Sequence, residues 1–138
     1  LDSDVEARHL KMKVGRVERH WQRNCLALGL SQGFIEPLEA TALNIVCNTI
    51  YDFIATVDKE GLAGAGRDGF NERVNDGFEM VRDYIVAHYI LNTRDDTDYW
   101  RQNGANTHVP ERLQQILQIW KSGQGVAQEM ERQQIRFN

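Results

Sequence analysis

The sequence of 138 residues predicts a mainly α-helical fold with a small β element. Apolar residues recur every three or four positions over residues 41–57 and again over 74–89, which is the period of an amphipathic helix. A third, shorter stripe of this kind follows Pro110, whereas patterns typical of strands are confined to residues 9–30. A chain of this length is expected to form one domain.

Two strands are expected before residue 31. In residues 9–15, "HLKMKVG", apolar and basic residues alternate and predict a half-buried strand that ends at Gly15. The apolar members of this strand are Leu10, Met12 and Val14. The run from Cys25 to Leu30 is continuously apolar, which predicts a fully buried strand. Because a buried strand needs neighbours on both edges and both faces, we expect part of the fold to lie outside this chain.

Two long helices follow. The apolar stripe of the first, over residues 41–57, is formed by Leu43, Val46, Cys47, Ile50, Phe53, Ile54 and Val57. A glycine-rich loop over residues 61–69 leads to a second helix, which we expect to begin after an Asn71 N-cap and to end near Asn92. The stripe of the second helix is formed by Val74, Phe78, Val81, Ile85 and Tyr89.

The last third of the chain predicts shorter elements. Residues 93–109 are polar and typical of an ordered loop or a short helix. Pro110 fits the first turn of a third helix, which glycines at 123 and 125 would end. Its apolar face is formed by Leu113, Ile116, Leu117 and Trp120. The tail, residues 126–138, is compatible with a further helix. We expect packing roles for Trp21, Tyr51 and Trp120.

Composition excludes some classes of partner. The net charge is −4 and basic residues are interleaved with acidic ones, which argues against a nucleic-acid partner. Cys25 and Cys47 lie in apolar settings without metal-ligand spacing, so we expect no metal, no disulfide framework and a reducing, cytoplasmic compartment. The sequence contains no continuous apolar run of about 20 residues, so we expect no membrane span. The first residue is Leu, so the chain is expected to begin inside a larger protein.

The stretch "GFIEPLEAT", residues 33–41, predicts a helix start near Pro37. If regular helix begins only after Glu39, the amides of Ala40, Thr41 and Ala42 are free to bind an anion. Alternatively, Glu36 and Glu39 only complement the helix dipole, as acids in a first turn commonly do. Two features favour a ligand: glycines at 29 and 33 allow a flat molecule to approach, and no Ser, Thr or Asn occupies the cap.

Two long motifs resemble flavin-dependent tryptophan halogenases. "GRVERHWQRNCLALGLSQGFIEPLEAT" is similar to the family's segment that ends in "GF(L/V/I)EPLEST", and "MVRDYIVAHYILNTRDDTDYWR" is similar to its "IRDF…HY…RDD(T/S)…(F/Y)WR". The resemblance covers most of residues 9–122. It implies that reduced FAD, supplied by a flavin reductase, and oxygen oxidise chloride or bromide to hypohalous acid, which halogenates an electron-rich arene such as tryptophan or another indole.

The resemblance also implies roles for particular residues. Glu39 corresponds to the catalytic carboxylate, a candidate general base. The backbone of Thr41 and Ala42 would hold the halide, and the cofactor would contact Gly29, Gly33 and Pro37. The substrate would contact His88, Tyr89, Asp95, Tyr99 and Trp100.

This chain departs from the family pattern at four of these positions: Ala40 replaces Ser, Ala42 replaces Gly, His88 replaces an aromatic residue and Asp95 replaces Glu. These departures put tryptophan itself in doubt as the substrate. Ordinary structural roles stay open for several residues: Tyr89 continues an apolar stripe, and the charges of residues 94–96 could pair with Arg82 or Arg101.

The family's GxGxxG phosphate loop and catalytic lysine lie in an amino-terminal half that this sequence does not contain. Glycines at 61–69 follow a helix rather than a strand, so they do not replace that loop. We therefore expect a carboxyl-side fragment of an α+β, FAD-dependent monooxygenase-like halogenase fold. Residues 1–40 would end the FAD-binding module and residues 41–138 would form part of a helical substrate module. Alone, the chain is expected to be inactive and to need its missing amino-terminal half.

Two other functions stay open: a flavin monooxygenase relative that hydroxylates, and a non-catalytic helical interaction module. We expect no membrane partner, and the sequence leaves a homodimer open.

Overall fold

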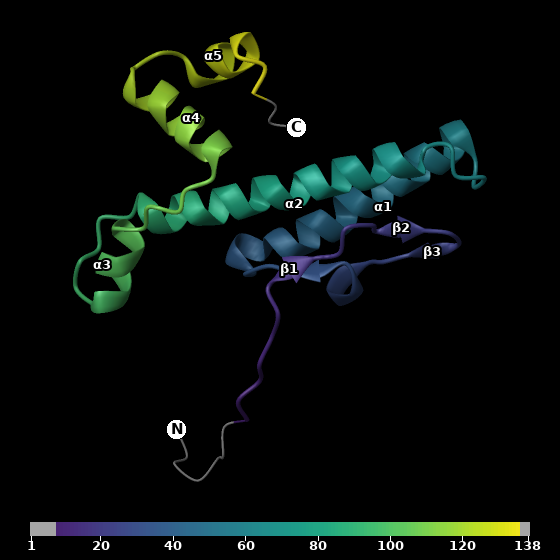
Figure 1. Ribbon diagram of the computed structural model, residues 1–138, viewed down its shortest axis with the longest axis horizontal. Coiled ribbons are helices and arrows are strands. Elements are labelled where there is room, and N and C mark those ends of the chain that lie inside the picture. Colours follow the sequence, from purple (N-terminus) through teal and green to yellow (C-terminus); the bar gives the residue numbers. More distant parts are fainter. Residues whose placement is uncertain (1–7, 136–138) are drawn as a thin grey trace.

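A computed structural model describes residues 8–135 and confirms a mainly helical fold with a small β element. The helices are α1 (Thr41–Glu60), α2 (Arg67–Ile90), α3 (Asp98–Gly104), α4 (Glu111–Lys121) and α5 (Val126–Arg132). Figure 1 shows α1 inclined against α2, with the carboxyl-terminal part of α2 extending beyond α1, the strands on one side of this pair and α4 and α5 on the other side of α2. Helix α3 lies at the carboxyl end of α2.

The strands are only two residues long and form two antiparallel pairs. β1 (Gly15–Arg16) pairs with β4 (Gly33–Phe34), and β2 (Trp21–Gln22) pairs with β3 (Cys25–Leu26). Short 3₁₀ turns, η1 (Gly29–Ser31) and η2 (Leu38–Ala40), connect this region to α1.

Both strand predictions were wrong in extent. Strand structure begins only at Gly15, and the apolar side chains before it, Leu10, Met12 and Val14, are exposed. The predicted buried strand stops after Leu26, because Gly29 adopts a φ of +61° that turns the chain into η1. Leu30 is therefore 79% exposed, and both cysteines are exposed free thiols.

The core lies where the β2–β3 hairpin covers the crossing of α1 and α2. Trp21, Phe53 and Phe70 meet edge to face, with ring centroids 4.9 to 5.9 Å apart. Ile45, Val74 and Phe78 extend this cluster. The packing role predicted for Trp21 is confirmed, since its side chain is 2% exposed.

Helix α1 is confirmed, but its buried face coincides only in part with the one expected: Phe53 and Val57 of the predicted stripe pack against the core. Its buried residues are Ile45, Thr49 and Thr56, which point toward the rest of the described fold. Much of the predicted stripe lies outside this contact, because α2 and the strands cover only one side of α1. The exposed apolar residues of α1 are Leu43, Cys47, Ile50 and Ile54, and Tyr51 is also exposed rather than packed.

The segment Leu38–Glu60 is long and apolar enough to cross a membrane by length and composition alone. The apolar residues that give the segment this composition include those exposed on α1, such as Leu43 and Ile54. On its other side the helix carries Asp52, whose carboxylate pairs with Arg73 of α2 at 3.0 Å, and the Thr56 hydroxyl accepts a hydrogen bond from the same arginine. The helix is thus bound to α2 by polar contacts as well as by packing.

Helix α2 begins at Arg67, four positions before the predicted cap. Asn71 is not a cap: it is buried inside the helix, where its side chain accepts from the Trp21 amide at 2.8 Å and donates to the Trp21 carbonyl at 3.0 Å. Asn71 thereby completes the hydrogen bonds of a buried strand residue. The predicted apolar stripe of α2 is confirmed, since Val74, Phe78 and Ile85 are buried.

The carboxyl-terminal elements agree with the sequence in position. Helix α3 lies inside the polar segment, Pro110 directly precedes α4, and α5 occupies the tail. Leu113 and Ile119 form the buried side of α4, whereas Trp120 is 60% exposed rather than packed. Helix α4 is held to α2 by Arg112, which donates to the buried carboxylate of Asp83 at 2.7 Å.

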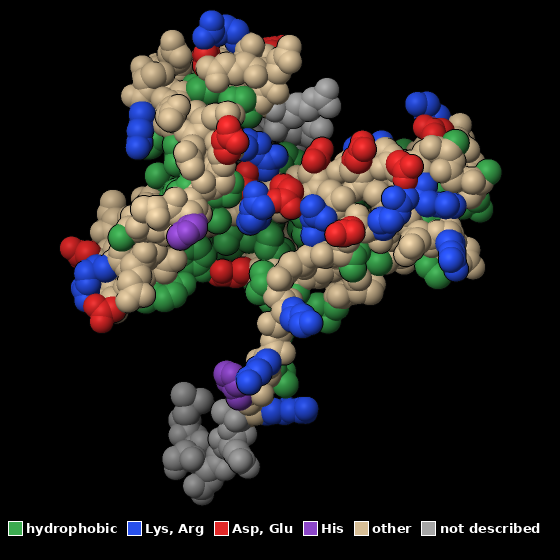
Figure 2. Space-filling view, viewed as in Figure 1, with side chains coloured by type: hydrophobic (Ala, Val, Ile, Leu, Met, Phe, Trp, Pro, Cys, Tyr) green, Lys and Arg blue, Asp and Glu red, His purple; other side chains and the backbone are tan. Residues whose placement is uncertain are grey.

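Charge is distributed unevenly over the surface. Figure 2 shows acidic and basic side chains alternating along α2, and hydrophobic side chains gathered between α3, α4 and the strands. Part of the charged surface is a continuous chain of ion pairs that runs from β1 to α4. Its members are Arg16, Glu79, Arg82, Asp83 and Arg112.

Candidate active site

Glu39 lies in a strained segment, inside η2 and two positions before α1. Glu39 has a φ of 51° and Ala40 a φ of 59°, so two successive non-glycine residues adopt the left-handed conformation. Such conformations cost roughly 1–3 kcal/mol each and concentrate at functional sites. The strain directs the exposed Glu39 side chain away from the ordinary path of a first helical turn.

The amides at this helix start are only partly as expected. Regular helix begins after Glu39, but the Ala40 amide donates to the Pro37 carbonyl at 3.3 Å and the Thr41 amide donates to the Leu38 carbonyl. Both amides therefore already donate a hydrogen bond to a backbone carbonyl, whereas the sequence predicted that they would be free to bind an anion. A halide bound by Thr41 would have to compete with the contact to Leu38. Ala42 lies one position further along and lines an apolar pocket.

Each glutamate of "EPLE" accepts a hydrogen bond from a tyrosine of α2. The Tyr84 hydroxyl donates to Glu39 Oε2 at 2.8 Å, and the Tyr89 hydroxyl donates to Glu36 Oε1. The bond to Glu39 raises the pKa of Tyr84, and the bond to Glu36, followed by that to Tyr99, raises the pKa of Tyr89. In both pairs the carboxylate disfavours the phenolate, so the phenol remains a donor to more alkaline pH than a free tyrosine would.

An aromatic cluster lies beside these pairs. The rings of Tyr89 and Trp100 are stacked with centroids 5.9 Å apart, and Tyr99 meets Trp100 edge-on at 5.1 Å. The Arg94 guanidinium lies over the Trp100 ring, 4.7 Å from its centroid. Three predicted substrate residues, from α2 and α3, thus form one group, and Tyr89 joins it to Glu36.

The remaining predicted substrate residues are placed differently. His88 meets the Tyr84 ring edge-on at 5.1 Å, so it lies beside the tyrosine that binds Glu39. Asp95 is an exposed loop residue whose carbonyl accepts from Arg101.

The charges of residues 94–96 do not pair with Arg82, which binds Glu79 and Asp83 instead. Asp96 pairs with Arg94 within its own loop at 2.8 Å.

The sequence reasoning missed Tyr84. Its signal was its place four residues before His88, which puts both side chains on one face of α2. Glu36, for which a role at the helix dipole was the alternative, is also bound by a residue of the aromatic cluster.

An apolar pocket of about 220 Å³ lies beside the helix start. It gathers the predicted cofactor residues Gly29, Gly33 and Pro37 with Ala42. Further lining residues are Leu30, Gln32, Phe34, Ile35, Leu43, Ile45, Val46 and Phe78. Part of a flat, mainly apolar ring system such as a flavin fits this lining.

Gln32 adds one polar feature to this pocket. Its side chain is buried, its Nε2 donates to Thr49 Oγ1 at 2.6 Å, and its Oε1 has no protein partner. Because the Thr49 hydroxyl donates to the Ile45 carbonyl, the orientation of the Gln32 amide is fixed by the network. This acceptor is itself buried, so it is a feature of the pocket wall rather than of its open surface.

The two glycines of the pocket have different reasons to be glycine. At Gly33 a Cβ would lie 2.6 Å from the Gly15 carbonyl oxygen, so the close approach of β1, rather than of a ligand, requires it. Gly29 has a positive φ and open space around its Cα. Only Gly29 therefore leaves room for a ligand at the backbone.

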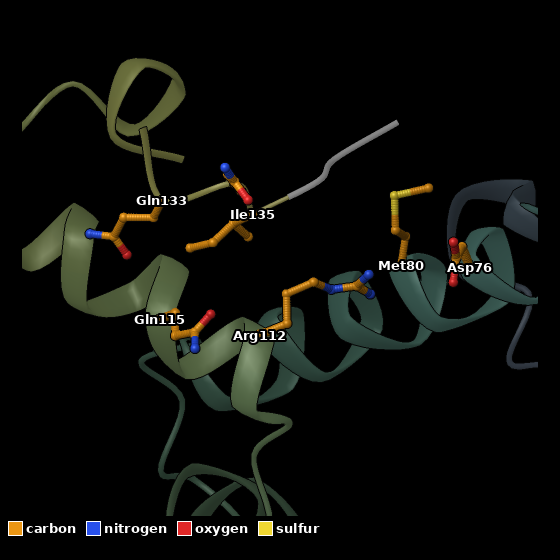
Figure 3. Close-up of a pocket in the computed structure, with 7 residues that line it drawn as sticks. Asp76, Met80, Arg112, Gln115, Gln133 and Ile135 are labelled. Carbon is orange, nitrogen blue, oxygen red and sulfur yellow. The ribbon is translucent and has the colours of Figure 1, made fainter. Parts of the chain in front are cut away.

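Other pockets lie away from the predicted residues. A polar pocket of about 360 Å³ is formed by Asp76 and Met80 of α2, Arg112 and Gln115 of α4, and the segment after α5 (Figure 3). It contains none of the predicted site residues. Over residues 8–135, no group of three or more His, Cys, Asp or Glu side chains is placed to hold a metal ion.

Solved structures define the class of protein to which this fold and site belong. BrvH, a flavin-dependent halogenase from Brevundimonas sp. BAL3, matches with a TM-score of 0.73 and 38% identity, over 85% of this chain and 24% of that chain. The tryptophan 6-halogenase SttH from Streptomyces toxytricini gives the same TM-score at 36% identity, over 86% and 23%. The chain is thus a piece of a flavin-dependent halogenase fold.

The particular family follows from sequence. The tryptophan halogenase family model matches residues 1–135, and the chain belongs to that family. SttH is 36% identical over 119 residues, which are 86% of this chain. The 7-chloro-L-tryptophan 6-halogenase KtzR of Kutzneria sp. is 32% identical over 120 residues, which are 87% of this chain. The chain spans 23% of the length of each of these relatives. The resemblance inferred from the two motifs is confirmed.

Proposed function

We propose that this chain is the carboxyl-side portion of an enzyme that chlorinates or brominates an electron-rich aromatic ring, such as tryptophan or another indole. The observation that carries the proposal is the position of Glu39. Its exposed carboxylate lies on a strained backbone, in a segment whose residues Pro37 and Ala42 line the apolar pocket and whose Glu36 is bound by Tyr89 of the aromatic cluster. Residues 1–40 would complete the cofactor module and residues 41–138 would hold the substrate.

FAD and a halide fit the residues on either side of the helix start. Gly29, Pro37 and Gln32 would hold the flavin ring, and the backbone at Thr41 and Ala42 would hold chloride or bromide. When bound and reduced by a separate reductase, FAD would react with oxygen and so provide the oxidant that converts the halide to hypohalous acid.

The residues of this chain would then act on the aromatic ring. The rings of Tyr89 and Trp100, which are stacked on each other in the structure, would hold the aromatic ring of the substrate by the same kind of stacking contact. A ring carbon forms a bond to the halogen as the oxygen–halogen bond of the oxidant breaks, and the oxygen leaves as hydroxide, which takes up a proton to become water. Glu39 accepts the proton from that carbon, and the electron pair of the carbon–hydrogen bond restores the aromatic ring. The lysine expected in the amino-terminal half would direct the oxidant, so the chain alone is inactive.

The test is halogenation by the full-length protein with FAD, a flavin reductase, bromide and an indole. The wild-type protein is expected to form brominated product, and Glu39→Gln is expected to lower its rate at least about 100-fold, because the amide cannot accept the ring proton. A matched control is Glu36→Gln, which is expected to change substrate binding more than the rate constant. Product that forms without halide and carries a hydroxyl group would instead indicate a monooxygenase.

A further inference from the structure

Tyr84 is the residue of this site to which no role has been given. Its hydroxyl lies 2.8 Å from Glu39 Oε2, although the two residues are 45 positions apart in the sequence. We propose that Tyr84 is a positioning residue for Glu39: it holds one carboxylate oxygen so that the other faces the aromatic substrate. This inference rests on the proposed function and deepens it.

The side chain of Glu39 has three rotatable bonds, and the Tyr84 hydroxyl is a donor to its carboxylate in the described residues. A freely rotating carboxylate would spend little time in the geometry that accepts a proton from a ring carbon. The left-handed backbone of Glu39 sets the direction in which the side chain leaves the chain, but it does not fix the carboxylate. A hydrogen bond from a long helix supplies the missing constraint.

Tyr84 has one ring contact and one hydroxyl contact. Its ring meets His88 edge-on at 5.1 Å, and its hydroxyl reaches the carboxylate of the neighbouring segment. The rest of the ring lines an apolar pocket of about 270 Å³ between α2 and α4, together with Leu113, Leu117 and Trp120, and Tyr84 is 38% exposed.

The two acid and tyrosine pairs differ in what they can do. Tyr89 stacks on Trp100 and would contact the substrate, so loss of its hydroxyl would affect binding. Tyr84 lies outside that cluster: its hydroxyl contacts Glu39 and its ring contacts His88, so removal of the hydroxyl alone affects only the contact to Glu39. A double-mutant cycle can therefore separate positioning of Glu39 from general damage to the site.

The first experiment uses the full-length protein with FAD, reductase, bromide and an indole. Tyr84→Phe is expected to lower kcat about tenfold while KM for the indole stays within about twofold, because the interaction acts on the reaction rather than on binding. In the Glu39→Gln background, where only residual product is measured, Tyr84→Phe should cause no further loss. Tyr51→Phe removes the hydroxyl of a tyrosine that is 73% exposed on α1 and is expected to leave kcat unchanged.

Equal losses from Tyr84→Phe in both backgrounds would overturn the inference, since additive effects mean that Tyr84 does not act through Glu39. An unchanged kcat in the single variant would overturn it as well. Thermal unfolding of each variant separates these outcomes from loss of the fold.

A second experiment tests the contact without any activity, on the 138-residue chain. Phenolate absorbance is followed during alkaline titration, and the difference between wild type and Tyr84→Phe isolates one of the four tyrosines. Glu39→Gln is expected to lower the pKa of Tyr84 toward its ordinary value, because the hydrogen bond to the carboxylate raises it. An identical titration in both proteins would show that the contact is absent and would overturn the inference. If the wild-type protein forms no halogenated product, the proposed function fails, and the titration still decides whether Tyr84 binds Glu39.

Discussion

At the scale of single residues, the site is defined by Glu39 and Ala40, whose backbones are both left-handed. Two such residues in succession before a 20-residue helix place a carboxylate outside the regular first turn, where it can meet Tyr84. The motif "EPLEAT" pointed to Glu39 as the acid. It could not indicate the strain, because backbone dihedrals of non-glycine residues have no simple signature in sequence. It could not indicate Tyr84 as the partner either, because that contact spans two helices.

Ala40 offers a direct measure of the strain. Ala40→Gly is expected to raise the free energy of unfolding by about 1 kcal/mol, because glycine adopts a positive φ without steric penalty. Ala55→Gly, in the exposed interior of α1, is the matched control and should lower it by about 1 kcal/mol. Both changes are measured by urea denaturation of the 138-residue chain. If Ala40→Gly destabilises as much as the control does, the left-handed conformation at residue 40 is wrong.

At the scale of elements, helices were predictable and strands were not. The stripe of α2 has the period of a helix, and Val74, Phe78 and Ile85 are buried as expected. The helix start was misplaced, because Asn71 has the chemistry of a cap and is used to bind the backbone of Trp21. The strands are two-residue pairs, too short to leave an alternating pattern, and their register depends on a close approach of β1 and β4.

That close approach makes Gly33 the residue on which the β1–β4 pair depends. Gly33→Ala is expected to lower the free energy of unfolding by about 2 kcal/mol, because its Cβ would lie 2.6 Å from the Gly15 carbonyl oxygen, a backbone atom.

Gly77→Ala in α2 is the matched control for Gly33→Ala. Its Cβ would meet no atom within 4 Å, so alanine should stabilise the helix by about 1 kcal/mol. Equal effects of the two variants in thermal unfolding would contradict the pairing of β1 with β4.

At the scale of the whole molecule, the chain leaves a large apolar surface uncovered. The predicted apolar stripe of α1 is broad, so it predicts neighbouring elements along much of the helix surface. The described residues cover mainly the side of α1 that carries Ile45 and Thr49. The expectation that part of the fold lies elsewhere was made from the run that ends at Leu30, which is indeed exposed. The strand predicted for that run extends only over Cys25–Leu26 and is not fully buried, so the exposed face of α1 supports this expectation better than the run does.

The uncovered face predicts how the 138-residue chain behaves by itself. Leu43, Ile50 and Ile54 of α1 are 69%, 38% and 58% exposed, and exposed apolar surface of this kind favours association. We expect the chain to self-associate at micromolar concentrations and to purify without bound FAD, because it contains no phosphate loop. Replacing Leu43 and Ile54 by Lys should lower the molar mass that light scattering measures for the chain toward that of the monomer. Replacing Asp58 and Glu60, which are also exposed on α1, by Lys should leave that mass unchanged. A monodisperse wild-type monomer would instead favour an independent helical module, and flavin that co-purifies with it would contradict the assignment of the cofactor's phosphates to another part of the protein.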